Sequence, residues 1–180
     1  VTSRGCPSKC TFCNVHDLSG RKYRYRSPGN ALKELKFLKE TYNIQEILFE
    51  DDNLTANRFR AGQLFQMMKE ANLGLEWDTP NGVAVFALDN DLLDLMKSSG
   101  CYRVNLAIES ADQDVIDKII KKPIKLDKVL PLIRHAQKIG LEVESFFIVG
   151  LPGTTLDQMR SNFEFMRKHD MFNGNTSIFV

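Results

Sequence analysis

The sequence lacks several features that mark particular classes of protein. No apolar run approaches the ~18 residues that a membrane-spanning helix needs, and no charged-then-apolar signal peptide opens the chain. The 24 Lys and Arg nearly balance the 23 Asp and Glu, and the net charge of +1 excludes a strongly basic nucleic-acid domain and an acidic solvating tail. With 43% apolar residues and 12 Phe among 180, the composition is typical of one globular domain.

Cysteine is also scarce, and its distribution is uneven. Cys6, Cys10 and Cys13 lie within eight residues, whereas Cys101 is far away and is expected to be a buried free thiol. A secreted disulfide framework would spread an even set of cysteines along a shorter, loop-rich chain. The closely spaced cysteines therefore indicate a metal or cluster site in a reducing compartment, and we expect a cytoplasmic protein.

Apolar periodicity alternates between short strands and helices along the chain. The expected strands are 1–3, 45–49, 75–79, 102–108, 143–149 and 177–180. The expected helices are 28–42, 58–72, 89–99, 112–120, 127–138 and 154–168, and Thr154 with Asp157 resembles a capping box for the last. Such alternation predicts parallel βαβ units. A full eight-unit barrel takes ~250 residues, so six units predict either a three-quarter barrel or an open doubly wound sheet.

The three clustered cysteines directly follow the first expected strand, where ligands bind in both α/β folds. Their spacings of four and three residues let one loop wrap three thiolates around a compact centre. Three thiolates satisfy three irons of a 4Fe–4S cluster and leave the fourth iron open to another ligand. His16 continues the series, so a Cys3His zinc site is an alternative. Three unliganded core cysteines are a further alternative, which the polar loop disfavours.

Several stretches together resemble one known family. Thr2-Ser-Arg-Gly-Cys-Pro-Ser-Lys-Cys-Thr-Phe-Cys13 looks like the signature of the radical S-adenosylmethionine (SAM) superfamily, and in particular of the radical enzymes that often follow a cobalamin-binding domain. The same order of motifs continues in Phe49-Glu-Asp-Asp-Asn53, Leu106-Ala-Ile-Glu-Ser110 and Phe147-Ile-Val-Gly-Leu-Pro-Gly153. The resemblance covers essentially the whole chain. It implies an α/β fold that is a partial (β/α)6 TIM-like barrel.

The resemblance assigns roles to residues near the cysteines. It makes Cys6, Cys10 and Cys13 the ligands of a 4Fe–4S cluster and places Phe12 near the adenine of SAM. After the second strand, 50–53 departs from the family's Gly-Gly-Glu stretch, and Asp52 is the carboxylate favoured to meet the SAM amine. A Mg2+ site in 50–52, or helix capping by Asp52 or its neighbour, is the alternative.

The later motifs are expected to meet the rest of SAM. Glu109 and Ser110 match the position that contacts the ribose or methionyl part, although a helix-cap cluster with Asp112 is an alternative. Lys121 and Lys122 lie where relatives carry a basic residue near the SAM carboxylate, and a solvated lysine run is equally compatible.

The fifth and sixth strands complete the expected SAM site. The turn holding Gly150 and Pro152 lies beside adenine in the family, and its glycines allow a close backbone approach. A simple strand-to-helix turn would have the same composition. Val180 or its neighbours are expected to complete the adenine pocket.

Two further features have a structural and a functional interpretation. The stretch 21–26 interleaves basic and aromatic residues, which could bind a nucleic acid, but a segment covering the cysteine loop is the favoured interpretation. Trp77 is expected in the core rather than facing a substrate.

We therefore expect an enzyme that cleaves SAM reductively to a 5′-deoxyadenosyl radical and modifies a small-molecule substrate by hydrogen abstraction. The expected electron donor is a flavodoxin or ferredoxin. Cobalamin is expected only through a domain absent from this chain, and since Val1 stands where a start Met belongs, residues 1–180 are expected to be one domain of a longer protein. The alternatives are a tRNA methylthiotransferase-like enzyme, a zinc-stabilised binding module and an electron carrier without SAM chemistry.

Overall fold

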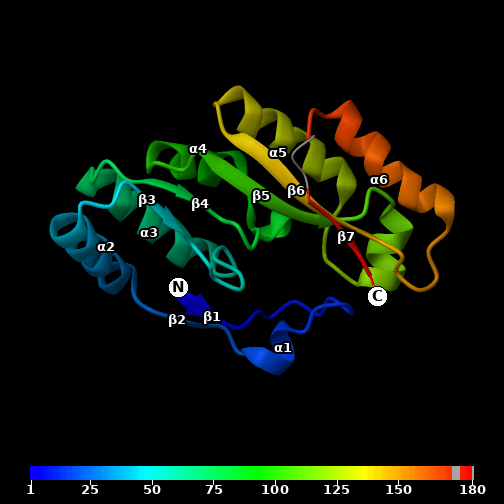
Figure 1. Cartoon of the computed structure of the whole chain (residues 1–180), viewed down its shortest axis with the longest axis horizontal. Helices are drawn as coiled ribbons and strands as arrows, with labels where there is room; N and C mark the ends of the chain where they lie inside the picture. The colour runs from blue at the N-terminus through cyan, green and yellow to red at the C-terminus, as the bar shows by residue number, and fades with distance from the viewer. Residues whose placement is uncertain (172–174, 180) are drawn as a thin grey trace.

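The structure is a computed structural model that describes residues 1–171 and 175–179. Strands and helices alternate through most of the chain (Figure 1). The strands are β1 (Ser3–Arg4), β2 (Arg24–Tyr25), β3 (Glu46–Leu48), β4 (Glu76–Asp78), β5 (Arg103–Glu109), β6 (Glu142–Val149) and β7 (Asn175–Ile178). The helices are α1 (Val15–Leu18), α2 (Pro28–Tyr42), α3 (Arg58–Ala71), α4 (Asn90–Ser98), α5 (Leu126–Lys138) and α6 (Leu156–Lys168), with the 3-10 turn η1 (Val85–Ala87) and the π-helical turn η2 (Val115–Ile120).

Local capping explains where the helices begin and end. The Ser27 hydroxyl accepts the backbone N–H of Asn30 at the start of α2, and Pro28 occupies the first turn, where no N–H is needed. In α6 the capping box is formed by Thr155 and Gln158, so the prediction of Thr154 and Asp157 was wrong by one residue. Thr154 instead donates its hydroxyl to the Leu151 carbonyl oxygen.

The predicted α/β class with parallel strands is confirmed. β3 pairs in parallel with β4, and β5, β6 and β7 form a second parallel group. Single parallel bridges from Trp77 to Cys101 and from Val83 to Leu106 connect the two groups. Among the described residues the strands do not close into a barrel, because β1 pairs with none of these parallel strands.

The first strand differs from its predicted parallel arrangement. β1 is only two residues long and pairs antiparallel with β2, a strand the sequence pattern did not reveal. The backbone N–H of Thr2 donates to the Asp51 carboxylate at 2.9 Å instead of to a neighbouring strand. The hydroxyls of Thr2 and Ser3 donate to the other oxygen of Asp51 at 2.7 and 2.5 Å. The buried Asp51 side chain therefore binds polar groups of the first strand segment, which in a closed barrel would be attached by hydrogen bonds to a neighbouring strand.

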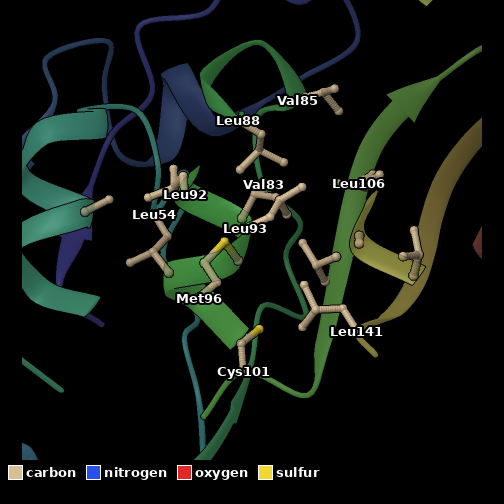
Figure 2. Packing of buried hydrophobic residues seen from close by; sticks show 14 of the residues in the cluster. Leu54, Val83, Val85, Leu88, Leu92, Leu93, Met96, Cys101, Leu106 and Leu141 are labelled. Atoms are coloured by element: carbon tan, nitrogen blue, oxygen red, sulfur yellow. The ribbon is translucent and has the colours of Figure 1, made fainter. Parts of the chain in front are cut away.

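Helices α4, α5 and α6 lie on one side of the parallel strands, and the amino-terminal segment lies on the other. Figure 1 shows α4, α5 and α6 along the upper edge, while β1, β2 and α1 run along the lower edge. The main core fills the space between the strands and the helices α2 to α5. Figure 2 shows Leu92, Leu93 and Met96 projecting from α4 between Leu54 on one side and Leu106 of β5 on the other. No helix among the described residues is both long and apolar enough to cross a membrane.

Trp77 and Cys101 belong to this core, as predicted. The Trp77 ring is fully buried, stacks on Phe65 at 4.9 Å between centroids and meets Phe49 edge-on at 5.3 Å. Its indole N–H donates to the Ser99 carbonyl oxygen at 3.1 Å, so the ring is packed and its polar atom is satisfied. Cys101 is a buried free thiol.

The Asp51 contacts generate a stability prediction. Asp51→Ala leaves the Thr2 N–H and two hydroxyls buried without partners, and we expect the free energy of unfolding to fall by about 3 kcal/mol. Glu50→Ala removes an exposed carboxylate one residue earlier and is expected to change the free energy by less than about 0.5 kcal/mol. Urea denaturation followed by circular dichroism measures both, and equal effects would contradict the proposed role of Asp51.

Candidate cofactor site

A cavity of about 500 Å3 opens at the carboxyl ends of the strands. Its walls come from the cysteine loop, from the segments after β3 and β4, and from the ends of β5, β6 and β7. The volume lies within the roughly 300–1,000 Å3 of small-molecule pockets. Cys6, Cys10, Cys13 and Phe12 all line it. The sequence predicted that a ligand binds at the carboxyl ends of the strands, and the structure has a cavity at that position.

The cysteine loop is held in position from both ends. Gly5 adopts a φ of +83°, and a Cβ there would lie 2.4 Å from the Lys22 carbonyl oxygen, so only glycine fits where the loop begins. Farther along, Thr11 donates its N–H to the Ile120 carbonyl oxygen and its hydroxyl to that of Ile119, at 3.1 and 2.8 Å. The loop is thereby attached to the end of η2.

The three thiols are free and partly buried. Burial raises the pKa of the Cys10 thiol, while the positive charge of Lys122 opposes that rise. The Asn53 amide lies 3.5 Å from the Cys6 sulfur as a hydrogen-bond donor. Three free thiols that line one cavity, with an amide donor beside one of them, fit a group that is bound through sulfur.

The zinc alternative finds no support in this arrangement. Within the described ranges no three Cys, His, Asp or Glu side chains converge closely enough to hold one metal ion. A single Zn2+ needs every thiolate within about 2.3 Å of one point, and His16 does not line the cavity. A 4Fe–4S cluster gives each thiolate its own iron, which suits three thiols that share one cavity.

The acidic residues after β3 are divided between two tasks. Asp51 is buried and bonded to β1, whereas Asp52 lines the cavity and accepts the Gly5 N–H at 2.7 Å. Asn57 caps α3, so neither Asp52 nor Asn53 does. Asp51 and Asp52 are directed to different partners, and within the described part of the chain the three acidic side chains of 50–52 do not converge as a Mg2+ site would require. Asp52 keeps a position from which it can meet an amine in the cavity.

Glu109 and Lys122 form a buried ion pair on the cavity wall. The Lys122 ammonium donates to Glu109 Oε1 at 2.7 Å and to the Ala107 carbonyl oxygen at 2.6 Å. The two side chains are only 8% and 7% exposed. The register of β5 shifts between Ala107 and Glu109, and Glu109 has a φ of +75°. Glutamate rarely adopts this backbone conformation, which costs of order 1–3 kcal/mol, and the bulge turns its carboxylate into the cavity.

The two lysines that the sequence could not distinguish have different environments. Lys122 lines the cavity, whereas Lys121 is exposed on the outer surface. Thus the solvated-run interpretation holds for Lys121 but not for Lys122.

Three predicted SAM contacts are not brought to the cavity wall. The Ser110 hydroxyl accepts the Asp112 N–H at 3.1 Å, as in the helix-cap alternative, and Ser110 does not line the cavity. Gly150 and Pro152 are exposed and likewise do not line it. The turn contributes through Leu151, which is buried with Val115 and Ile120 in a small apolar cluster.

Phe12 connects this apolar cluster to the cysteines. It packs against the cluster and also lines the cavity. An apolar wall beside the thiols fits the flat face of an adenine ring. Val180, the other predicted contributor, lies outside the described residues.

Several cavity residues were missed by sequence reasoning. Asn81 and Gly82 follow β4, and Phe146 and Ile148 of β6 line the cavity together with Phe147 between them. Gly82 has a φ of +80°, and a Cβ there would lie 2.8 Å from the Phe146 ring. No signal in the sequence marked Phe146 or Ile148, because β6 is apolar without interruption over 146–149 and shows no alternation there.

The fold and the site define an α/β partial-barrel domain with a thiol-lined cavity at the carboxyl ends of its strands. The family model of the radical SAM superfamily matches residues 1–166. The chain belongs to the radical SAM superfamily, a family whose members use a 4Fe–4S cluster and SAM.

Known proteins similar to the chain include several methyltransferases. Cytidylyl-2-hydroxyethylphosphonate methyltransferase from Streptomyces wedmorensis is 40% identical over 170 residues, which are 91% of this chain and 32% of the relative. An uncharacterized methyltransferase from Pyrococcus horikoshii is 32% identical over 171 residues, covering 95% of this chain and 37% of the relative. The chain thus spans about a third of the length of these relatives.

Solved structures show the same fold. The radical SAM methyltransferase TsrM from Kitasatospora setae, with cobalamin and a [4Fe-4S] cluster bound, superposes with a TM-score of 0.89 at 19% identity, over 98% of this chain and 35% of that one. The cobalamin-dependent radical SAM enzyme OxsB, with aqua-cobalamin and SAM bound, gives 0.76 at 19% identity, over 94% of this chain and 26% of that one.

The buried Lys122–Glu109 pair can be tested by a double-mutant cycle. Lys122→Met leaves the Glu109 carboxylate buried without its counter-charge, and we expect a loss of about 3 kcal/mol in the free energy of unfolding. The double variant K122M/E109Q should lose less than the sum of the two single variants. Exposed Lys121→Met is the control and should change stability by less than about 0.5 kcal/mol. Strict additivity in urea denaturation would show that the pair is not coupled.

Proposed function

We propose that residues 1–180 form the catalytic core of a longer radical SAM methyltransferase, in which Cys6, Cys10 and Cys13 hold a 4Fe–4S cluster and the adjoining cavity holds SAM. The observation that carries the proposal is that one cavity is lined by all three thiols and by a buried Lys–Glu pair. When bound together, the cluster and SAM supply reductive cleavage of the sulfonium S–C5′ bond, which yields a radical that abstracts hydrogen from the substrate.

The chain's own residues offer complementary groups for the parts of SAM. The methionyl end carries an ammonium and a carboxylate, and the Glu109 carboxylate and Lys122 ammonium have the matching opposite charges. Asp52 offers a second carboxylate to the amine from the other wall. Because Glu109 and Lys122 are already paired and held by the β5 bulge, binding orders few additional groups.

The apolar wall has a separate task. Phe12 and Ile148 present carbon surface beside the thiols, which suits adenine and excludes water from the reacting bond. Gly150, Pro152 and Ser110, which were expected to contact SAM, are proposed instead to act indirectly: the first two flank Leu151 of the apolar cluster, and Ser110 accepts the Asp112 N–H in the turn after Glu109.

The substrate, the second cofactor and the electron donor are inferred from the relatives. The 40% identity with the Streptomyces wedmorensis enzyme supports methyl transfer to a small molecule over methylthiolation of tRNA. TsrM and OxsB bind cobalamin, and we propose that the intact protein does so through a domain outside residues 1–180. We propose a flavodoxin or ferredoxin as the reductant, and a cytoplasmic location because four free thiols require a reducing compartment.

The decisive experiment is anaerobic reconstitution of the protein with iron and sulfide, followed by SAM and dithionite. We expect about four irons per chain and formation of 5′-deoxyadenosine, with S-adenosylhomocysteine followed in the same chromatogram as the by-product of methyl donation. Cys10→Ala should abolish 5′-deoxyadenosine because one iron loses its protein ligand.

His16→Ala is the matched control, since it removes the fourth candidate zinc ligand and leaves the three thiols unchanged. It should retain the cluster and the product. One tightly held zinc that His16→Ala removes, with no iron cluster, would overturn the proposal. A four-iron cluster without any SAM-derived product would favour an electron carrier.

A further inference from the structure

Positive charge is concentrated around the cysteine loop, although the chain as a whole is nearly neutral. Residues 1–26 contain six Lys and Arg and one acidic residue, Asp17, whereas the net charge of the chain is +1. Figure 1 shows that this segment, with β1, β2 and α1, runs along one edge of the molecule. We call the exposed side chains of Arg4, Lys9, Lys22, Arg24 and Lys121 the basic face.

The basic face touches the cysteine loop on both sides. Arg4 immediately precedes Gly5, and the Lys22 backbone is packed so tightly against Gly5 that a Cβ would not fit. On the other side, Lys9 and Lys121 line a separate hollow of about 450 Å3, which also includes Pro7 and Ser8 of the loop. The charges therefore surround the outer surface of the segment that carries the three thiols.

The charges of the basic face are not neutralised by the protein itself. Within residues 1–171 and 175–179, none of the five forms an ion pair with a carboxylate. The acidic residue in the hollow, Asp117, is already paired with Lys125. Arg4 and Arg24 are direct cross-strand partners in the β1–β2 pair, an arrangement of like charges that destabilises a sheet. Such a conflict with local rules is typical of a surface used for binding.

The interleaved aromatic residues do not form a base-stacking platform. Tyr23 is half-buried and its hydroxyl donates to the Leu54 carbonyl oxygen at 3.4 Å. Tyr25 lies 5.4 Å from the Tyr23 ring between centroids, and the Arg60 guanidinium lies over it at 5.9 Å. Tyr25 is about half exposed, but the Arg60 guanidinium covers one face of its ring, so the segment does not present two free rings on which successive bases could stack. Nucleic-acid binding by stacking is therefore disfavoured.

We propose that the basic face is the docking surface for an acidic one-electron carrier protein of the flavodoxin or ferredoxin type. This inference rests on the proposed function, since it assumes a cluster at Cys6, Cys10 and Cys13. In the encounter the reduced carrier loses one electron and the cluster gains it, and no bond forms or breaks. Electron transfer falls steeply with distance, so a donor must dock beside the cysteine loop, where the unpaired charges lie.

The charge pattern predicts how such an encounter behaves. Unpaired surface charges accelerate association with an oppositely charged partner by roughly 10–1,000-fold at low ionic strength. Salt screens them over a Debye length of about 8 Å at 0.15 M. Binding of the carrier should therefore weaken as salt rises, whereas reduction by a small chemical reagent needs no docking surface.

The test uses two charge-matched triple variants of the intact protein. The first, K9E/K22E/K121E, reverses three charges of the basic face whose side chains make no hydrogen bond or ion pair within the described residues. The second, K128E/K138E/K168E, reverses three exposed lysines on α5 and α6, along the opposite edge in Figure 1. Both change the net charge equally, so only the location differs.

The first measurement is the binding of purified flavodoxin by biolayer interferometry, at low and high salt and without SAM. The second is the rate of 5′-deoxyadenosine formation, measured once with reduced flavodoxin and once with dithionite as the electron donor. For the basic-face variant we expect about tenfold slower flavodoxin association, a similar loss of the flavodoxin-driven rate, and an unchanged dithionite-driven rate. The α5–α6 variant should match the unsubstituted protein. Equal losses in both variants, or none, would overturn the docking proposal.

The two proposals fail in different ways. If the unsubstituted protein forms no 5′-deoxyadenosine with dithionite, the proposed function fails, and flavodoxin binding still decides the docking surface. If the basic-face variant instead loses binding of a transfer RNA while flavodoxin binding is unchanged, the surface is a nucleic-acid site and the docking proposal is wrong.

Discussion

The Asp51 carboxylate is the contact on which the site depends. Its two oxygens accept one N–H and two hydroxyls from Thr2 and Ser3, and so attach β1 to the end of β3. β1 has only β2 as a strand partner. Since the cysteine loop begins two residues after Ser3, this buried group fixes where the loop starts, and the Thr11 contacts with η2 fix its other end. The adjacent Asp52 holds Gly5 in the same way, so two consecutive carboxylates position the start of the loop.

A second constraint fixes the opposite wall. The bulge in β5 and the positive φ of Glu109 oppose the intrinsic preference of that residue. Lys122 compensates because it binds both the Glu109 carboxylate and the Ala107 carbonyl oxygen, across the bulge itself. The lysine therefore stabilises an unfavourable backbone and places a charge of each sign in one cavity. A site built this way is organised before a ligand enters, which lowers the entropy cost of binding.

The sequence predicted the parts of this structure that depend on local pattern. Strand–helix alternation was enough for the α/β class, and the burial of Trp77 follows from its size and apolar surroundings. The sequence could not show that Asp51 faces β1 while Asp52 faces the cavity, because neighbouring carboxylates differ only in the tertiary contacts they make. Lys121 and Lys122 were indistinguishable for the same reason, although one is exposed and the other is buried. The short β2 was missed because two residues carry no periodicity.

Charges on the two sides of the cysteine loop have different environments, because one side faces the cavity and the other faces solvent. Inside the cavity, each charge has a partner of opposite sign or a hydrogen bond, as Lys122, Glu109 and Asp52 show. Outside it, Arg4 and Arg24 face each other across a strand pair without a carboxylate between them. Buried charges must be paired to be tolerated, whereas water solvates exposed charges, so Arg4 and Arg24 remain without a carboxylate partner even though like charges across a strand pair are unfavourable. A loop between these two environments can therefore keep its inner side organised for a cofactor while its outer side remains charged for a transient partner.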